Sequence, residues 1–156
     1  EIFEYSRKIE YVIVGVGGGG LISGISSVLK TLNPKIKIIG VEPLNSNVIT
    51  KSLTSNKPEL LSSNNTIADG LAAPFAGNIT LKYIKKFVDK VVCVKESEIK
   101  NSLKQIIKNE KLIVEPAAAA TIAALVYDKI SIPKKSNVLC LMCGSNIDSK
   151  FLKKLL

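Results

Sequence analysis

The sequence predicts an α/β fold, with an open, mostly parallel sheet and helices on both of its faces. Two observations carry this prediction: short β-branched runs alternate with helical segments along the chain, and the first such run ends directly in glycines. This alternation is typical of layered α/β domains. A length of 156 residues is enough for one domain with one core.

The first βαβ unit covers residues 11–41. Tyr11–Val16 is a β-branched run that predicts a strand, and Leu21–Leu32 carries apolar residues at the spacing of a helix. Asn33 ends this helix because it precedes a proline, and Ile36–Val41 predicts the second strand. A crossover of this kind is right-handed and joins parallel strands.

The middle of the chain is less regular. Residues 44–65 are mostly polar, and only Val48, Ile49 and Leu53 indicate a short helix. Thr66–Gly77 is too often interrupted by glycine and proline for a long helix, and too apolar for a solvated loop. We expect this segment to be a buried loop that lines a site.

The C-terminal half continues the alternation. Pro116–Tyr127 begins with a proline at a favourable helix position and is apolar all round, so we expect a helix buried on most of its faces. The other expected helices are Ile79–Phe87, Glu96–Lys108 and Phe151–Leu156, and the other expected strands are Lys90–Val94 and Val138–Met142.

Composition excludes several kinds of chemistry. The chain has no histidine, which rules out Ser-His-Asp and Cys-His catalysis and HExxH metal sites. The net charge is +9, but the lysines are scattered, which indicates a solvated surface and no nucleic-acid partner. Because no apolar run approaches the ~20 residues that cross a bilayer, we expect no membrane association.

The three cysteines, Cys93, Cys140 and Cys143, are an odd number, and two of them lie in strand-like segments. This usage suits the reducing cytoplasm better than a disulfide framework, so we expect a cytoplasmic protein. Cys140 and Cys143 have the spacing of metal ligands, but no second pair accompanies them, and Cys140 is interpreted as a small buried side chain.

A glycine-rich turn between the first strand and the first helix is the strongest functional signal. Glycines at positions 15 and 17–20 let the backbone approach a ligand and direct free N–H groups of the helix start towards an anion. A phosphate or carboxylate ligand is therefore expected. The spacing of Gly15, Gly17 and Gly20 also satisfies the dinucleotide fingerprint, with Glu42 as the ribose-binding acid about 20 residues further on. NAD thus stays open as an alternative.

Further candidate residues follow apolar segments. Glu115 lies between an apolar run and the alanine-rich helix, where it either faces a site or caps the helix at Pro116. Cys143 follows the last strand, at the edge of the sheet where ligands of open α/β folds bind. Asp69, directly before Gly70, has an alternative role in an Asx turn.

Taken together, several motifs resemble those of the fold-type II pyridoxal-phosphate enzymes, and within them the threonine/serine dehydratase family, with serine racemase as a near relative. The motifs are Gly17–Gly24, Val41–Pro43, Thr66–Ala72, Val114–Pro116 and Cys143–Asp148, and the similarity covers essentially the whole chain. The resemblance implies a tryptophan-synthase-β-like fold, here incomplete, with pyridoxal 5'-phosphate as cofactor.

The resemblance also implies roles for single residues. Cys143 would face the pyridine nitrogen, Gly70 would lie beside the cofactor, and Glu115 would face its ring. In racemase-like members a cation binds at the acid that matches Glu42, but one of the two later ligand positions is Val48, which has no ligand atom. The cofactor phosphate would be bound by Gly17, Gly18, Gly19, Gly20 and the backbone of Leu21.

Two motifs of this family are absent from the sequence: the Ser-x-Lys-x-Arg-Gly segment with the cofactor-bearing lysine, and the Ser-Ser-Gly-Asn-His loop for the substrate. Residues 1–156 are therefore expected to be the C-terminal part of the cofactor-binding domain, with the N-terminal half missing. The intact protein, expected to be a homo-oligomer, would convert the amino acids L-threonine or L-serine into a 2-oxo acid and ammonia. The alternatives are a serine racemase, an NAD-dependent dehydrogenase and an inert isolated fragment.

Overall fold

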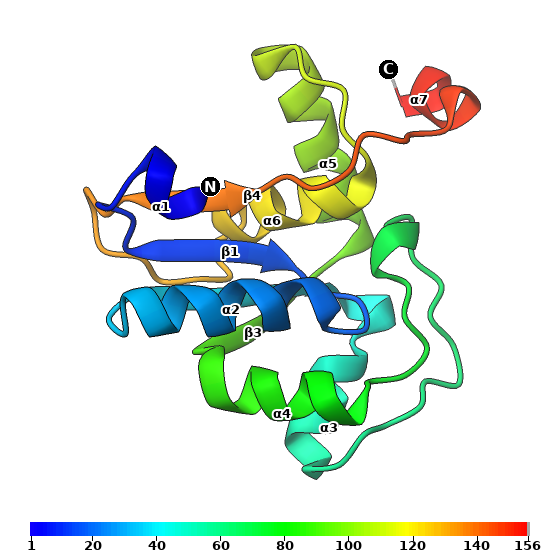
Figure 1. Cartoon of the computed structure of the whole chain (residues 1–156). Helices are drawn as coiled ribbons and strands as arrows, with labels where there is room; N and C mark the ends of the chain where they lie inside the picture. The colour runs from blue at the N-terminus through cyan, green and yellow to red at the C-terminus, as the bar shows by residue number, and fades with distance from the viewer. Residues whose placement is uncertain (156) are drawn as a thin grey trace.

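The computed structural model of the chain describes residues 1–155, apart from the side chain of Tyr5. Four parallel strands form one sheet in the order β3-β2-β1-β4 (Figure 1). The strands are β1 (Tyr11–Gly15), β2 (Lys37–Pro43), β3 (Lys90–Val94) and β4 (Val138–Leu141). The predicted open parallel sheet is confirmed.

The carboxyl ends of the strands meet at one edge of the sheet, because all pairings are parallel. β2 runs two residues beyond its predicted end at Val41, since Glu42 and Pro43 still pair with β3. Segments that follow the strands gather at this edge, where open α/β folds bind their ligands.

Helices cover both faces of the sheet, as predicted. α2 (Gly20–Leu32), α3 (Val48–Ser55) and α4 (Asn78–Phe87) share one core with the sheet, and α5 (Glu96–Gln105) and α6 (Pro116–Val126) share the other. Successive residues of β1 alternate between these cores: Ile13 packs with α5 and α6, whereas Val12 and Val14 face α2.

α6 is buried on most of its faces, which confirms the prediction for this segment. Its first two turns, from Pro116 to Thr121, are buried without interruption. Alanine side chains make this possible, because they let the helix backbone lie close to the sheet and to α5. The tight packing fixes the start of α6, and with it the residue that precedes the helix, Glu115.

Some short elements differ from the predictions. The regular part of α5 ends at Gln105, and the predicted remainder of that helix forms a wider π turn at Ile106–Glu110. The irregular loop contains a 3-10 turn, η2 (Asp69–Leu71), and a similar turn, η1 (Leu44–Ser46), follows β2. α1 (Ile2–Tyr5) was not predicted, and α7 (Ser149–Leu155) confirms the last predicted helix, whose final residue, Leu156, lies outside the described residues.

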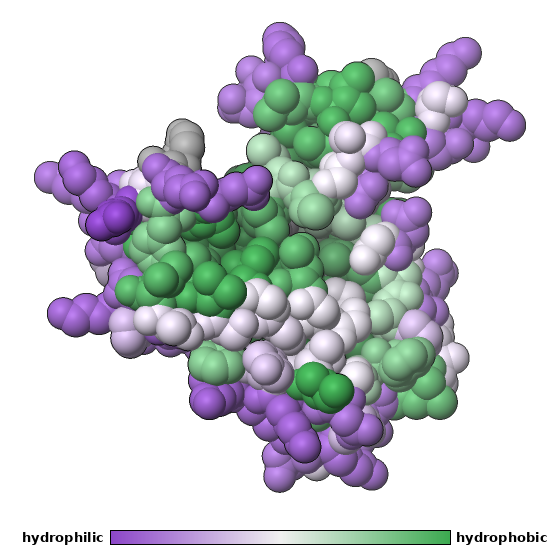
Figure 2. All heavy atoms as spheres, in the orientation of Figure 1, coloured by the Kyte–Doolittle hydropathy of each residue, from purple (hydrophilic) through white to green (hydrophobic). Residues whose placement is uncertain are grey.

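β4 forms an outer edge of the sheet, and its apolar side chains are only half-buried. Val138 and Cys140 pack against one core and Leu139 and Leu141 against the other, so both faces of the strand stay partly open. Figure 2 shows apolar surface gathered around this edge, between α1 and α5. None of the helices formed by residues 1–155 has the length and hydropathy that a bilayer crossing requires.

Candidate functional site

The glycine-rich turn joins β1 to α2 at the carboxyl edge of the sheet and encloses a cavity of about 170 Å³. The lining residues come from this turn, the first turn of α2 and η2: Gly15, Val16, Gly17, Gly18, Gly19, Gly20, Leu21, Ile22, Gly70 and Leu71. The structure therefore brings the five predicted phosphate-binding residues together with Gly70, which the resemblance places beside the same cofactor.

Two glycines of the turn are required by the fold, and two leave room for a ligand. Gly19 has a left-handed backbone with a φ of 88°, and a Cβ on Gly17 would lie 3.3 Å from the carbonyl oxygen of Gly70. A Cβ on Gly18 would come within 3.9 Å of one side chain only, and a Cβ on Gly20 would meet nothing within 4 Å. The open side of the turn is thus free for a ligand that approaches the backbone.

The N–H groups of this turn have no protein acceptor in the part of the chain that the structure describes. Before the turn, the N–H of Val16 donates to the carbonyl of Val41 at 2.8 Å; after it, the N–H of Ser23 donates to that of Gly19 at 3.1 Å. No described side chain caps α2, and its first turn carries no acid. Unpaired N–H groups and the positive end of the helix dipole favour an anion here.

Three polar side chains fasten the loop at residues 66–72 beside the cavity. From the start of α5, Glu96 Oε2 accepts the N–H of Ile67 at 2.8 Å. The buried hydroxyl of Ser46 donates to the carbonyl of Leu71 at 3.1 Å, and the amide of Asn64 donates to the next carbonyl at 2.8 Å. None of these anchors was predicted from the sequence, because each contact joins segments that no local pattern connects.

The carboxylate of Glu115 faces the site and does not cap α6. The carbonyl of Glu115 accepts the first helix hydrogen bonds, whereas its side chain makes no capping bond. Its Oε1 atom lies 3.2 Å from where a Cβ on Gly70 would stand, and the carboxylate packs directly against Gly144. Within the site, Asp69 Oδ1 accepts the N–H of the next residue, Gly70, at 2.9 Å. The expected Asx turn, which needs a bond two residues on, is not formed, because the N–H of Leu71 donates to the carbonyl of Ala68.

Cys143 follows β4, and its side chain is exposed. Because β4 pairs with β1, Cys143 and the glycine turn follow neighbouring strands at one edge of the sheet. Cys140 lies within β4, and burial raises the pKa of its thiol to about 11. Of these two thiols, only Cys143 is open to a ligand.

Glu42 is fully buried and binds the N-terminus of α3. Its carboxylate accepts the N–H of Ile49 at 2.7 Å, and both the N–H and the hydroxyl of Thr50 at 2.8 and 2.6 Å. Burial raises the pKa of Glu42 in spite of these bonds. Among the described residues, no three His, Cys, Asp or Glu side chains group closely enough to hold a metal ion. Cation binding at Glu42 stays a prediction from the resemblance.

α4 contacts the glycine turn through Thr80, a residue that was not predicted to belong to the site. The hydroxyl of Thr80 lies 2.9 Å from the carbonyl oxygen of Gly18 and 3.0 Å from that of Gly77. In return, the hydroxyl of Ser23 in α2 donates to the carbonyl of Thr80 at 3.3 Å. Only the short hydroxyl side chain near a helix start could have drawn attention to Thr80.

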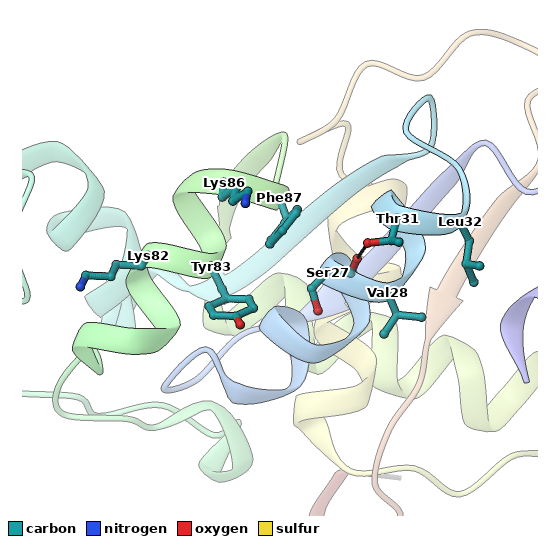
Figure 3. A pocket seen from close by; sticks show the side chains of 8 residues that line it. All are labelled: Ser27, Val28, Thr31, Leu32, Lys82, Tyr83, Lys86 and Phe87. Carbon is teal, nitrogen blue, oxygen red and sulfur yellow. Dashed lines mark hydrogen bonds between the residues drawn. The ribbon is translucent and has the colours of Figure 1, made fainter.

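A larger groove of about 540 Å³ lies between α2 and α4, away from the strand ends (Figure 3). Its walls are Val28 and Leu32 on one helix and Tyr83 and Phe87 on the other. Lys82 extends away from the groove, and the hydroxyl of the bordering Thr31 is bonded within its own helix. Because no set of polar groups converges there, the smaller cavity at the glycine turn is the better candidate.

Residues 1–144 match the protein family described as "Pyridoxal-phosphate dependent enzyme". The chain is 36% identical over 156 residues to the L-threonine ammonia-lyase of Thermotoga maritima, covering all of this chain and 38% of that protein. Among solved structures, the processed form of threonine deaminase isoform 2 from Solanum lycopersicum has a TM-score of 0.90 and 32% identity, over 99% of this chain and 45% of the other. Maize serine racemase has a TM-score of 0.90 and 34% identity, over 98% of this chain and 47% of the racemase chain.

The fold and the cavity thus define an α/β protein whose glycine turn is suited to an anion. The chain belongs to the family of pyridoxal-phosphate-dependent enzymes. This membership decides between the two phosphate ligands that the glycine spacing left open, in favour of pyridoxal phosphate over NAD. The chain spans less than half the length of each of these three relatives.

Proposed function

We propose that this chain forms the phosphate-binding and ring-binding part of a pyridoxal-phosphate-dependent L-threonine/L-serine ammonia-lyase. The observation that carries the proposal is the set of unpaired N–H groups from Gly17 to Gly20, around a cavity whose lining contains no acid. The threonine ammonia-lyase and threonine deaminase among the relatives support the reaction class.

The residues of the turn fit the phosphate of the cofactor. Backbone N–H groups from Gly17 to Leu21 would bind its oxygens, and the start of α2 would stabilise its charge. A Cβ on Gly18 or Gly20 would enter the open space that the phosphate needs. Val16 and Ile22 are buried behind the turn and would exclude water from that side of the ligand.

Three residues outside the turn would face the ring end of the cofactor. When bound, pyridoxal phosphate supplies an electron-accepting ring that stabilises negative charge on the substrate. Gly70 would let the ring approach the backbone, and the carboxylate of Glu115, which accepts no bond from a described side chain, would be available to a ring substituent. A thiol is a weak donor, so Cys143 would leave the ring nitrogen largely unprotonated, which favours β-elimination or racemisation over transamination.

The remaining catalytic groups would come from an N-terminal half of the same protein. The sequence contains no Ser-x-Lys-x-Arg-Gly segment, and the chain spans less than half of its relatives. That half would supply the cofactor-bearing lysine and the contacts to the amino-acid substrate. In this proposal, residues 1–156 alone bind phosphate compounds at most, and the intact protein is a homo-oligomer. Three free thiols support a cytoplasmic setting.

Serine racemase is the second candidate function, and one observation favours it: the maize serine racemase matches as closely in fold as the threonine deaminase does. Against it, Val48 at one expected cation-ligand position is a buried apolar residue. Product analysis separates the two functions. The lyase releases a 2-oxo acid and ammonia from L-serine or L-threonine, whereas the racemase forms D-serine.

Retention of pyridoxal phosphate by the intact protein tests the proposed site. Gly18→Val should abolish retention, because the new side chain would occupy the phosphate space without a clash inside the protein. Gly24→Val is the matched control, since Gly24 lies in α2 and its Cβ would also meet nothing within 4 Å. Cofactor content is read from absorbance after gel filtration, and folding from circular dichroism. Full retention by Gly18→Val would overturn the assignment.

A further inference from the structure

The glycine turn receives one side-chain hydrogen bond from a distant helix. The hydroxyl of Thr80 is 2.9 Å from the carbonyl oxygen of Gly18, across 62 residues of sequence. The same hydroxyl lies 3.0 Å from the carbonyl of Gly77, the residue before α4. Both carbonyls accept from a single hydroxyl proton, so Thr80 links the turn to the start of α4.

This bond fixes the direction of a peptide group that faces the cavity. A trans peptide is planar, and its C=O and N–H point in opposite directions. When the Gly18 carbonyl is held towards Thr80, the N–H of Gly19 is directed away from α4. Thr80 does not line the cavity, whereas Gly18 and Gly19 do. The hydroxyl therefore orients a donor of the site from outside it.

The packing around Gly19 supports the same arrangement. With its φ of 88°, Gly19 turns the side where a Cβ would stand towards α4, at 3.2 Å from Cβ of Thr80 and 2.8 Å from Cδ1 of Ile84. The Ser23 hydroxyl, which donates to the carbonyl of Thr80, joins the same two helices one turn further on. The turn is therefore packed against α4 and hydrogen-bonded to it.

We propose that Thr80 is a positioning residue that sets the affinity of the glycine turn for a phosphate group. The inference rests on the proposed function only in identifying that group as part of pyridoxal phosphate. Removing the hydroxyl releases the Gly18–Gly19 peptide, which then rotates among orientations in which the N–H of Gly19 no longer points at the anion.

The test compares three variants of the full chain. Thr80→Val removes the hydroxyl and keeps the shape of the side chain, whereas Thr80→Ser keeps the hydroxyl. Thr54→Val is the matched control, because the hydroxyl of Thr54 bonds a carbonyl within its own helix, α3, at 3.0 Å. Dissociation constants for inorganic phosphate and pyridoxal phosphate are measured by titration, with the amide NMR signal of Gly19 as a local readout. Thermal unfolding verifies that each variant is folded.

Thr80→Val is expected to weaken both ligands about fivefold to tenfold, the loss of roughly one net hydrogen bond, and to abolish the phosphate-induced shift of the Gly19 signal. Thr80→Ser and Thr54→Val should bind as the parent chain does. Unchanged affinity in Thr80→Val, or equal weakening in Thr80→Ser, overturns the positioning role.

A parent chain that binds neither ligand does not contradict the proposed function, because that proposal concerns the intact protein and is decided there by retention of pyridoxal phosphate. The positioning role is then decided by the crystal structure of Thr80→Val. A Gly18 carbonyl rotated away from α4 supports the role of Thr80, and an unmoved carbonyl overturns it.

Discussion

The carboxylate of Glu115 occupies the space that a side chain on Gly144 would need. The two residues are also joined through the backbone, since the N–H of Glu115 donates to the carbonyl of Gly144 at 3.2 Å. These contacts fasten the segment after β4, which carries Cys143, to the start of the buried helix α6. Two candidate site residues from separate elements are thereby held in a fixed relation.

Gly144→Ala should therefore destabilise the protein and displace Glu115. Gly144 has a φ of 110°, which residues with a Cβ rarely adopt, and the added Cβ would overlap the carboxylate. We expect a loss of about 2 kcal/mol in the free energy of unfolding, measured by urea titration. Gly24→Ala serves as control and should gain roughly 0.5–1 kcal/mol, because Gly24 lies in an open position inside α2. Equal stability of the two variants would contradict this account.

The buried carboxylate of Glu42 should make stability fall as the pH rises above about 4.5. Burial raises the pKa of Glu42 above its ordinary value of 4.5, in spite of the bonds from Thr50 and Ile49. The folded state then binds the proton more tightly than the unfolded state. This binding adds to the free energy of unfolding at low pH, and the contribution is lost as the pH rises through the raised pKa. Urea unfolding across this pH interval should show the parent protein losing stability relative to Glu42→Gln. A gain with rising pH would contradict the prediction.

Asp89 should show the opposite pH dependence. Partial burial raises the pKa of Asp89, but the N–H of Ile38 and the ammonium groups of Lys30 and Lys37 outweigh it and hold the pKa below 3.8. The Lys30 pair has an N–O distance of 2.7 Å. This stabilisation is present above pH 3.8 and is lost as the pH falls through the lowered pKa. Acid titrations followed by circular dichroism should show that Asp89→Asn flattens this loss; an unchanged acid transition would exclude the role.

The thiols should differ sharply in their rates of alkylation. Cys143 is exposed, whereas Cys140 is half-buried and has a pKa of about 11. At about pH 8, only about one Cys140 thiol in a thousand is ionised, and the thiolate is the reactive form. Mass spectrometry after brief iodoacetamide treatment should find label on Cys143 well before Cys140. In the intact protein, pyridoxal phosphate should slow labelling of Cys143, and equal rates with and without cofactor would count against its place at the ring.

The sequence predicted the elements whose signal is local. The strand, glycine turn and helix at residues 11–32 follow from side-chain periodicity and from the run of glycines between them. The structure differs by one residue at the end of the strand and at the start of the helix. The alanine-rich helix at Pro116 was also predicted from a local signal, the proline at its start and the apolar residues that follow. Its apolar character on all sides leaves burial as the only stable arrangement.

Long-range contacts account for what the sequence did not predict. Cation binding at Glu42 stays a prediction from the resemblance, but the hydrogen bonds from the start of α3 to its oxygens were not predicted. Thr80 and Glu96 hold the two loops of the site, but each does so across many residues of sequence, where no periodicity or spacing records the contact. The Glu115 side chain likewise packs against Gly144, which lies 29 residues further along the chain. No pattern in the sequence connects these two residues.

The close approach of Gly17 to Gly70 has a consequence for altering this protein. Because a methyl group on Gly17 would press on the carbonyl of Gly70 at 3.3 Å, any enlargement there also shifts the loop against which Glu115 packs. The glycine turn and the loop at residues 66–72 therefore pack closely together at this point. A substitution meant to fill the cavity without moving the loop that carries Gly70 must therefore be placed at Gly18 or Gly20, where a Cβ meets little or nothing of the protein.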